Sequence, residues 1–252
     1  MRYNANIKFE GFAMNIKKYK DKKISILGDS ISTFDGVSVP DGASFYDTNN
    51  KLASNVIAVC DTWWGQVINK LQAELLINNS ISGSTVTFHP SYEIQSYGCS
   101  DERTSSLCKN GITPDVIIIY LGTNDWGSGV KVFDENNPND LTVFFNAYTR
   151  MLKKIKQNYP DAEIWCVTLG KSICSKKSNF EFPCYIKGRH IEEYCKAIKR
   201  CAKENNCFVV DLFDNETVYD TIDGFHPDSC GMKSIANAVL DSLKNCLKSG
   251  NL

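Results

Sequence analysis

Four short polar segments of the chain hold side chains that could together perform nucleophilic catalysis. They are Gly28-Asp29-Ser30-Ile31-Ser32, Gly83 within Ser82-Gly83-Ser84, Gly122-Thr123-Asn124-Asp125 and Asp223-Gly224-Phe225-His226-Pro227. Each follows an apolar, strand-like run of sequence. Because ligands bind at the carboxyl ends of the strands in an open parallel α/β sheet, we expect all four segments at one edge. The pattern therefore predicts a single site, with Ser30 as the candidate nucleophile.

A serine hydroxyl becomes a useful nucleophile only when a hydrogen-bonded base removes its proton, and histidine suits that task at neutral pH. The chain has 3 histidines. His190 begins an expected helix and His89 lies in a long loop, whereas His226 precedes a proline, which disfavours a helical conformation there. The glycine in the same turn allows Asp223 and His226 to face the same way. We therefore expect Asp223 to orient His226, and His226 to face Ser30.

The tetrahedral intermediate of acyl transfer carries a negative charge and needs hydrogen-bond donors already directed at it. The side-chain amide of Asn124 and the backbone N–H groups of Gly83 and Ser30 could supply them. A glycine at position 83 would let a substrate approach the backbone closely. The alternative for Gly83 is an ordinary turn residue.

Strand-like and helix-like segments alternate along the chain, which is typical of a parallel sheet covered by helices on both faces. We expect five short, continuously apolar strands, as in strands buried on both faces, near 24–27, 75–78, 116–121, 164–169 and 208–212. Apolar residues at helical spacing predict helices over 63–71, 144–155, 191–202 and 232–243. Pro160 is expected to end the second helix, and Asp228 to cap the last.

Two long connections, at about 32–60 and 84–114, exceed the usual length of a loop in a compact domain. They hold many aromatic residues: Phe34, Phe45, Tyr46, Phe88, Tyr92 and Tyr97. Such a composition argues against disorder. We expect these two connections to form the walls of a substrate cleft.

Composition and charge place the chain among ordinary globular proteins. Its 252 residues, 42% hydrophobic, are enough for one sizeable core, and a single domain is expected over 23–252. Because the first expected strand begins only at Ile24, residues 1–22 are expected to be an N-terminal extension, ragged over 1–13, with Met14 as an alternative start. The net charge of −1 favours neither nucleic acid nor an anionic membrane surface as a partner. The 11 cysteines show no zinc-site spacing and are expected to be reduced. No run of apolar residues reaches the length of a membrane span. A cytoplasmic protein is therefore expected.

Taken together, the motifs resemble those of the SGNH hydrolase superfamily, also called the GDSL esterase/lipase family. Gly28-Asp29-Ser30-Ile31-Ser32 is similar to its first block, Gly122-Thr123-Asn124-Asp125 to its third and Asp223-Gly224-Phe225-His226-Pro227 to its last. The second block, around Gly83, is a partial match. The resemblance covers about residues 23–247. It implies a flavodoxin-like three-layer α/β/α sandwich, with no metal and no organic cofactor.

The resemblance also assigns roles to individual residues. It implies Ser30 as nucleophile, His226 as base, Asp223 as its orienting partner, and Gly83 and Asn124 as oxyanion-hole donors. Arg103 follows the second block, where some members of the superfamily carry a basic residue. It could bind a substrate carboxylate or hold its loop through a salt bridge, and the structural role is favoured because loop charges are usually paired.

Two other enzyme classes are excluded by their motifs. Gly170-Lys171-Ser172 imitates the end of a phosphate-binding loop, but position 165 is Trp where that motif needs glycine. Ser30 lacks the second glycine of the α/β-hydrolase nucleophile elbow. A serine esterase acting on a small-molecule ester remains, with acetyl or other short acyl groups favoured and carbohydrates as one candidate for the alcohol portion. Lysophospholipid or thioester hydrolysis, and a non-catalytic protein binding sugar or acyl groups, stay open, as does the oligomeric state.

Overall fold

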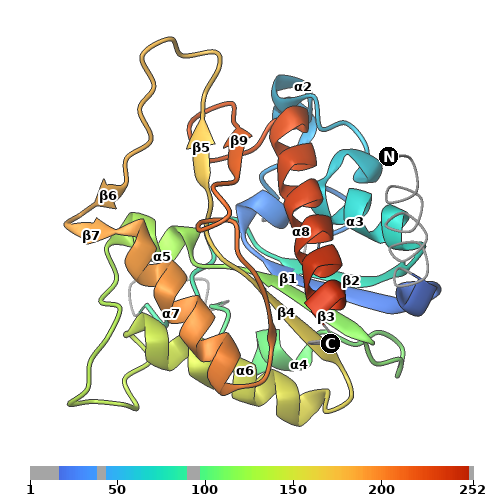
Figure 1. Cartoon of the computed structure of the whole chain (residues 1–252), viewed down its shortest axis with the longest axis vertical. Coiled ribbons are helices and arrows are strands. Elements are labelled where there is room, and N and C mark those ends of the chain that lie inside the picture. The colour runs from blue at the N-terminus through green and yellow to red at the C-terminus, as the bar shows by residue number, and fades with distance from the viewer. Residues whose placement is uncertain (1–16, 39–43, 90–96, 250–252) are drawn as a thin grey trace, which may run out of the picture.

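A computed structural model describes residues 17–38, 44–89 and 97–249. Its central sheet has five parallel strands in the order β2-β1-β3-β4-β8. Their bounds are β1 Lys23–Gly28, β2 Glu74–Ser80, β3 Val116–Tyr120, β4 Glu163–Val167 and β8 Phe208–Val210. The five expected strands are confirmed, although the last three end one or two residues earlier than expected. The α/β sandwich with a parallel sheet is therefore confirmed (Figure 1).

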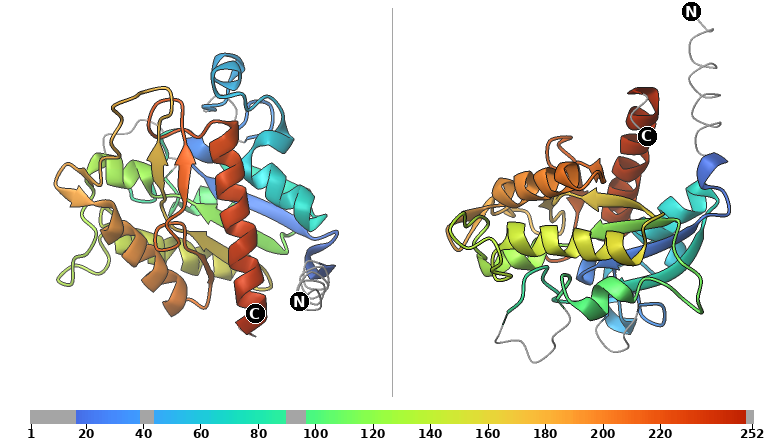
Figure 2. Two further views of the ribbon diagram at one scale, coloured as in Figure 1. Left: turned by 45° about the horizontal axis from the view of Figure 1, so that its top comes forward. Right: turned by 90° about the horizontal axis from the view of Figure 1, so that it is seen from below.

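Four long helices cover the sheet in two packed pairs (Figures 1 and 2). One pair is α3 (Trp63–Leu71) with α8 (Ser229–Ser249), and the other is α6 (Phe144–Asn158) with α7 (Ile191–Glu204). Right-handed crossovers on either side of β1 place the two pairs on opposite faces. All four helices were expected from their apolar stripes, whose residues are buried.

The ends of two helices also follow the expected signals. The helix α6 stops at Asn158, two positions before Pro160. The side chain of Asp228 accepts a hydrogen bond of 2.8 Å from the backbone N–H of Gly231, so it caps the start of α8. These caps satisfy backbone groups that the helices themselves leave without partners.

Several short elements were not expected. They are the helices α2 (Thr48–Ser54), α4 (Asp101–Ser105) and α5 (Thr123–Ser128), the parallel pair β5 (Lys171–Ile173) with β9 (Val218–Asp220), and the hairpin β6 (Tyr185–Ile186) with β7 (Arg189–His190). Each is too short to show a hydrophobic period. Local caps define the first two instead, because Asp47 and Ser100 accept bonds from the first-turn amides of α2 and α4.

The described part of the N-terminal segment packs onto the domain. Tyr19 lies in a 3-10 turn over Lys17–Tyr19, and its side chain is buried against Trp165, with the ring centroids 5.2 Å apart. Its hydroxyl donates to Glu163. The residues expected as a ragged extension, 1–13, lie outside the described residues, whereas 17–22 continue directly into β1.

Three general features bear on function. No disulfide joins the eleven cysteines, all of which lie in the described part of the chain. Within residues 17–38, 44–89 and 97–249, no helix combines the length and the apolar character needed to cross a bilayer. The same residues contain no group of three or more His, Cys, Asp or Glu side chains arranged to hold a metal ion.

The close approach at the end of β1 gives a first test of the fold. A Cβ on Gly28 would lie 2.6 Å from the Ser32 side chain and 2.8 Å from Ser80 Oγ. Gly28→Ala should therefore lower the free energy of unfolding by about 1–3 kcal/mol, as overpacking usually does. Urea denaturation measures it. Gly127→Ala, with no atom near its added Cβ, is the control. Equal stability of the two variants would contradict the tight contact.

Candidate active site

The candidate nucleophile lies in a tight turn directly after β1. Ser30 begins a 3-10 turn, and Asp29 caps it by accepting a 3.0 Å hydrogen bond from the N–H of Ile31. Asp29 therefore has a capping role in this turn. Ser30 itself is only 7% exposed. A largely enclosed hydroxyl is partly shielded from competing water.

A second group of contacts holds this turn from beneath. The carbonyl of Ser32 accepts hydrogen bonds of 2.9 Å from the Trp64 indole and from the Asn78 amide. The indole of Trp63 donates to Ser32 Oγ at 3.2 Å. Because all these side chains are buried, the turn that carries Ser30 is fixed to both α3 and β2.

Ser30, His226 and Asp223 form a continuous hydrogen-bonded chain. His226 Nε2 lies 2.9 Å from Ser30 Oγ, and His226 Nδ1 lies 2.6 Å from Asp223 Oδ2. Asp223 Oδ1 accepts from the backbone N–H groups of Phe225 and His226. Burial pushes the pKa of Asp223 upward, but the bonds from His226 and these amides outweigh it and hold the pKa at about 2. The carboxylate therefore stays ionised at neutral pH and can orient the imidazole.

The turn that holds Asp223 and His226 requires its glycine. Gly224 has a φ of +112°, and a Cβ there would lie 2.6 Å from the ring of Phe180. Its N–H donates to Thr221 Oγ1, and its carbonyl accepts from Ser172 Oγ. The glycine therefore provides both the backbone conformation and the close packing of the turn.

The segment after β2 carries Gly83, one of the expected oxyanion donors, and contacts Asn124. Gly83 is exposed and has a φ of +77°, and nothing lies within 4 Å of its would-be Cβ. Asn124 Nδ2 donates a 2.9 Å hydrogen bond to the carbonyl of Ser84, the residue next to Gly83. This bond links two of the expected donors, and an amide NH2 has a second hydrogen for a ligand.

Asp125 fixes the same segment at a second point. Its carboxylate accepts from the N–H groups of Val86 and Thr87, at 2.8 and 3.1 Å, and from Thr87 Oγ1 at 2.7 Å. Asp125 thus joins α5, which follows β3, to the segment after β2, so that Asn124 and Gly83 are held by neighbouring contacts.

Arg103 lies beneath the site rather than facing a ligand. Its side chain is buried, and its guanidinium donates to the carbonyls of Gly28 and Asn79 and to Ser84 Oγ, at 2.8–3.0 Å. These contacts support the structural role over the substrate-binding role. These three acceptors are neutral oxygens.

Two aromatic contacts at the site were missed from the sequence. Phe45 stacks on the imidazole of His226, with centroids 3.5 Å apart and planes 8° apart. Tyr46, which is buried, donates its hydroxyl to the carbonyl of Pro227 at 2.7 Å. Both residues come from the first long connection, which was expected to wall a cleft. The only available signal was their place in that aromatic-rich segment.

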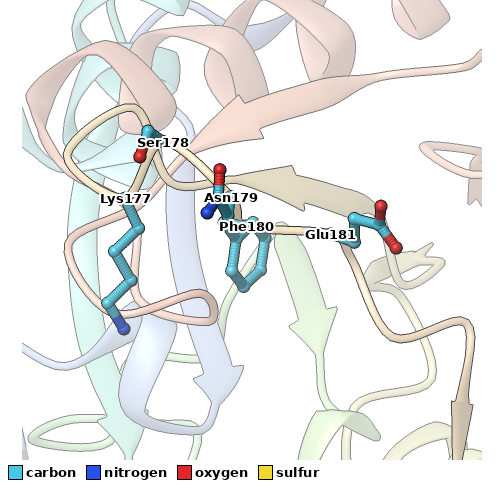
Figure 3. A pocket seen from close by; sticks show the side chains of 5 residues that line it. All are labelled: Lys177, Ser178, Asn179, Phe180 and Glu181. Carbon is cyan, nitrogen blue, oxygen red and sulfur yellow. The ribbon is translucent and has the colours of Figure 1, made fainter.

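The segment between β5 and β6 borders the turn that holds Asp223 and His226 and was not expected there. Lys177 Nζ donates to the carbonyl of Asp223 at 3.1 Å, and Phe180 packs on Gly224. The same loop forms an open hollow of about 570 Å³ (Figure 3). Its lining comprises Lys177, Ser178, Asn179, Phe180 and Glu181. A hollow with charged, amide and aromatic side chains therefore adjoins the turn that carries the base.

A further aromatic cluster joins the segment between β5 and β6 to α5. Trp126 lies 5.4 Å from Phe182 and 6.3 Å from Phe225, measured between ring centroids. Trp126 is two residues after Asn124, and Phe225 lies between Asp223 and His226. The histidine at the start of α7, His190, accepts a bond from Glu192 N–H, as its place in the sequence indicated.

The two buried acids of the site give a test by pH. Burial raises the pKa of Asp29 to about 7 and that of Asp125 to about 6, despite their hydrogen bonds. Above the ordinary pKa of 3.8, the unfolded chain loses protons that the folded protein keeps. The free energy of unfolding should therefore fall as pH rises through this window, by up to about 1.4 kcal/mol per pH unit for one group.

Urea denaturation between pH 4 and 8 measures that decline. Asp29→Asn keeps an oxygen that can accept from Ile31 N–H, and it should make the decline shallower. Asp161→Asn, at an exposed turn, is the control. Identical slopes for the wild type and Asp29→Asn would contradict a protonated, buried Asp29.

Comparison with known proteins agrees with the fold and with the motifs. Two solved GDSL-like lipases resemble the chain over nearly their whole length. The one from Bacteroides uniformis is 31% identical with a TM-score of 0.67, over 89% of this chain and 96% of that one. The one from Bacteroides ovatus is 27% identical with a TM-score of 0.68, over 89% and 98%.

A shorter match connects the chain to a curated protein. It is 38% identical over 53 residues to the cellulase/esterase CelE of Acetivibrio thermocellus, which is 21% of this chain and 6% of that protein. The family model for GDSL-like lipase/acylhydrolase matches residues 22–243. The chain therefore belongs to the GDSL-like lipase/acylhydrolase family.

Proposed function

We propose that this protein is a serine esterase that hydrolyses short-chain acyl esters, with acetyl esters of carbohydrates as the favoured class. The observation that carries the proposal is the hydrogen-bonded chain from Asp223 through His226 to Ser30. Family membership supports a hydrolase, and the geometry of this chain supports the serine mechanism.

In the first half-reaction, Ser30 Oγ attacks the ester carbonyl while His226 Nε2 takes the hydroxyl proton. Asp223 holds the proton on Nδ1, so the lone pair of Nε2 faces Ser30. Collapse of the intermediate breaks the bond to the alcohol oxygen, which receives the proton from Nε2. Water then repeats these steps on the acyl-enzyme and releases the acid.

The developing oxyanion would be stabilised by the N–H groups of Ser30 and Gly83 and by the amide of Asn124. The bond from Asn124 to the Ser84 carbonyl supports this role because it orients the amide before a substrate binds. The exposed backbone of Gly83 leaves room for the ligand. Donors fixed in advance need no rearrangement when the charge forms.

The favoured alcohol portion of the substrate is a sugar. Flat aromatic faces and nearby polar groups are the usual partners of a ligand that has both apolar faces and hydroxyl groups. The hollow beside the catalytic turn offers Phe180 with Asn179 and Glu181 (Figure 3). The short match to a cellulase/esterase points the same way.

The first test is hydrolysis of acetylated sugars and of p-nitrophenyl esters of increasing chain length. The wild type should prefer acetyl esters, and Ser30→Ala should lose at least about 10³-fold in kcat because the nucleophile is gone. Ser105→Ala, at an exposed serine of α4, is the matched control. Release of acid is followed by titration.

The outcome of that screen separates the alternatives. Equal, slow hydrolysis by the wild type and Ser30→Ala would contradict the enzyme and favour a protein that only binds sugars or acyl groups. A preference for long acyl chains, lysophospholipids or thioesters would retain the serine mechanism and replace the substrate class.

The second test removes one oxyanion donor. Asn124→Ala should lower kcat by about 10²- to 10³-fold with a small change in KM, because the lost bond forms mainly in the transition state. Asn205→Ala is the control, since Asn205 also donates a side-chain bond to a backbone carbonyl, at the end of α7. Full activity of Asn124→Ala would remove Asn124 from the site.

A further inference from the structure

A short segment of the first long connection joins the nucleophile to the base. Thr33 Oγ1 donates to the carbonyl of Ser30 at 2.8 Å and accepts from the backbone N–H of Phe45 at 2.9 Å. One residue later, the buried hydroxyl of Tyr46 donates to the carbonyl of Pro227. The backbone around Phe45 is therefore fixed on one side to the Ser30 turn and on the other to the His226 turn.

The ring of Phe45 lies between these two attachments and faces the imidazole. The two planes are nearly parallel, at 8°, and their centroids are 3.5 Å apart. Phe45 also meets Tyr46 edge to face at 5.1 Å, and its carbonyl accepts from Asn50 Nδ2. The aromatic face therefore has little freedom to move away from His226.

The imidazole needs such a support because one hydrogen bond does not fix its plane. The bond to Asp223 anchors Nδ1, but rotation about the Cβ–Cγ bond of histidine has a broad energy profile. A small rotation would carry Nε2 away from Ser30 Oγ, which lies 2.9 Å from it. A flat, rigid surface against the ring opposes that rotation.

We propose that Phe45 is a positioning residue, whose ring holds the imidazole plane of His226 in line with Ser30 Oγ. This inference rests on the proposed esterase function. It differs from a simple packing role, because packing requires apolar volume whereas positioning requires a flat face. Substitutions at this one position separate the two.

The kinetic test compares Phe45→Leu with Phe45→Tyr on p-nitrophenyl acetate. Leucine keeps an apolar side chain without a flat face, whereas tyrosine keeps the ring. Phe45→Leu should lower kcat by about 10-fold with a small change in KM, since misplacement of a catalytic group affects the chemical step. Phe45→Tyr should stay within about 2-fold of the wild type, because it preserves the stacking face.

A matched control removes a phenylalanine ring contact elsewhere. Phe133 is 40% exposed and lies 5.2 Å from Phe145, so Phe133→Leu loses a ring contact outside the site. It should leave kcat unchanged. Thermal unfolding of every variant shows whether a loss of kcat follows a loss of the fold.

A second measurement needs no substrate. Long-range ¹H–¹⁵N NMR of the histidine rings shows which nitrogen of His226 carries the proton, and His226→Gln identifies its signals among the 3 histidines. The wild type and Phe45→Tyr should show a single tautomer with the proton on Nδ1. In Phe45→Leu the imidazole can rotate, which lengthens its bond to Asp223 as well as its bond to Ser30, so signals of both tautomers should appear.

The outcomes distinguish this inference from the proposed function. Wild-type kcat together with a single tautomer in Phe45→Leu would overturn the positioning role. Equal losses in Phe45→Leu and Phe45→Tyr would also overturn it, in favour of packing. A wild type without hydrolysis would defeat the proposed function, and the tautomer comparison would still decide the role of Phe45.

Discussion

The buried guanidinium of Arg103 is the interaction on which the carboxyl edge of the sheet depends. It bonds a carbonyl at the end of β1, a carbonyl near the end of β2 and the hydroxyl of Ser84 in the segment that follows. A charge removed from water is costly, and the hydrogen bonds that it makes offset that cost. Burial lowers the pKa of Arg103 to about 9, and the negative charges of Asp29 and Glu102 oppose that shift. The planar guanidinium of arginine can donate to these separate acceptors at once, whereas the compact ammonium of lysine cannot reach all of them.

Ser84 contacts both Arg103 and the candidate oxyanion donor Asn124. Its hydroxyl accepts a hydrogen bond from the guanidinium of Arg103, and its carbonyl accepts one from the side chain of Asn124 in α5. Asp125 holds the next residues of the same segment by three further bonds. The exposed turn at Gly83 is therefore fixed by buried contacts on its C-terminal side. An arrangement of this kind keeps donors in place without side chains that would crowd a ligand.

The sequence predicted what short-range pattern and strand order determine. The five strands and four long helices have clear hydrophobic patterns, so they were predictable. The contact between Asp223 and His226 was also predictable, because both residues lie in one turn. Phe45 was not, because its contact with His226 spans 181 positions and leaves no periodic signal. The partners of Arg103 include backbone carbonyls, which any residue carries, so its charge alone suggested a salt bridge. The β5–β9 pair has three residues in each strand, too few for a pattern.

The contacts from Ser30 through Thr33 and Phe45 to the Pro227 turn join segments that are far apart in the chain. This separation has a consequence for how the molecule folds. The strand β1 pairs with β2 and β3, the next two strands of the central sheet along the chain, whereas His226 follows all five strands of that sheet. Loop-closure entropy opposes such long-range contacts until the intervening chain is ordered. During synthesis, the Ser30 turn is therefore made early and the His226 turn late. An emerging chain carries Ser30 without His226 until all five strands of the central sheet have been translated.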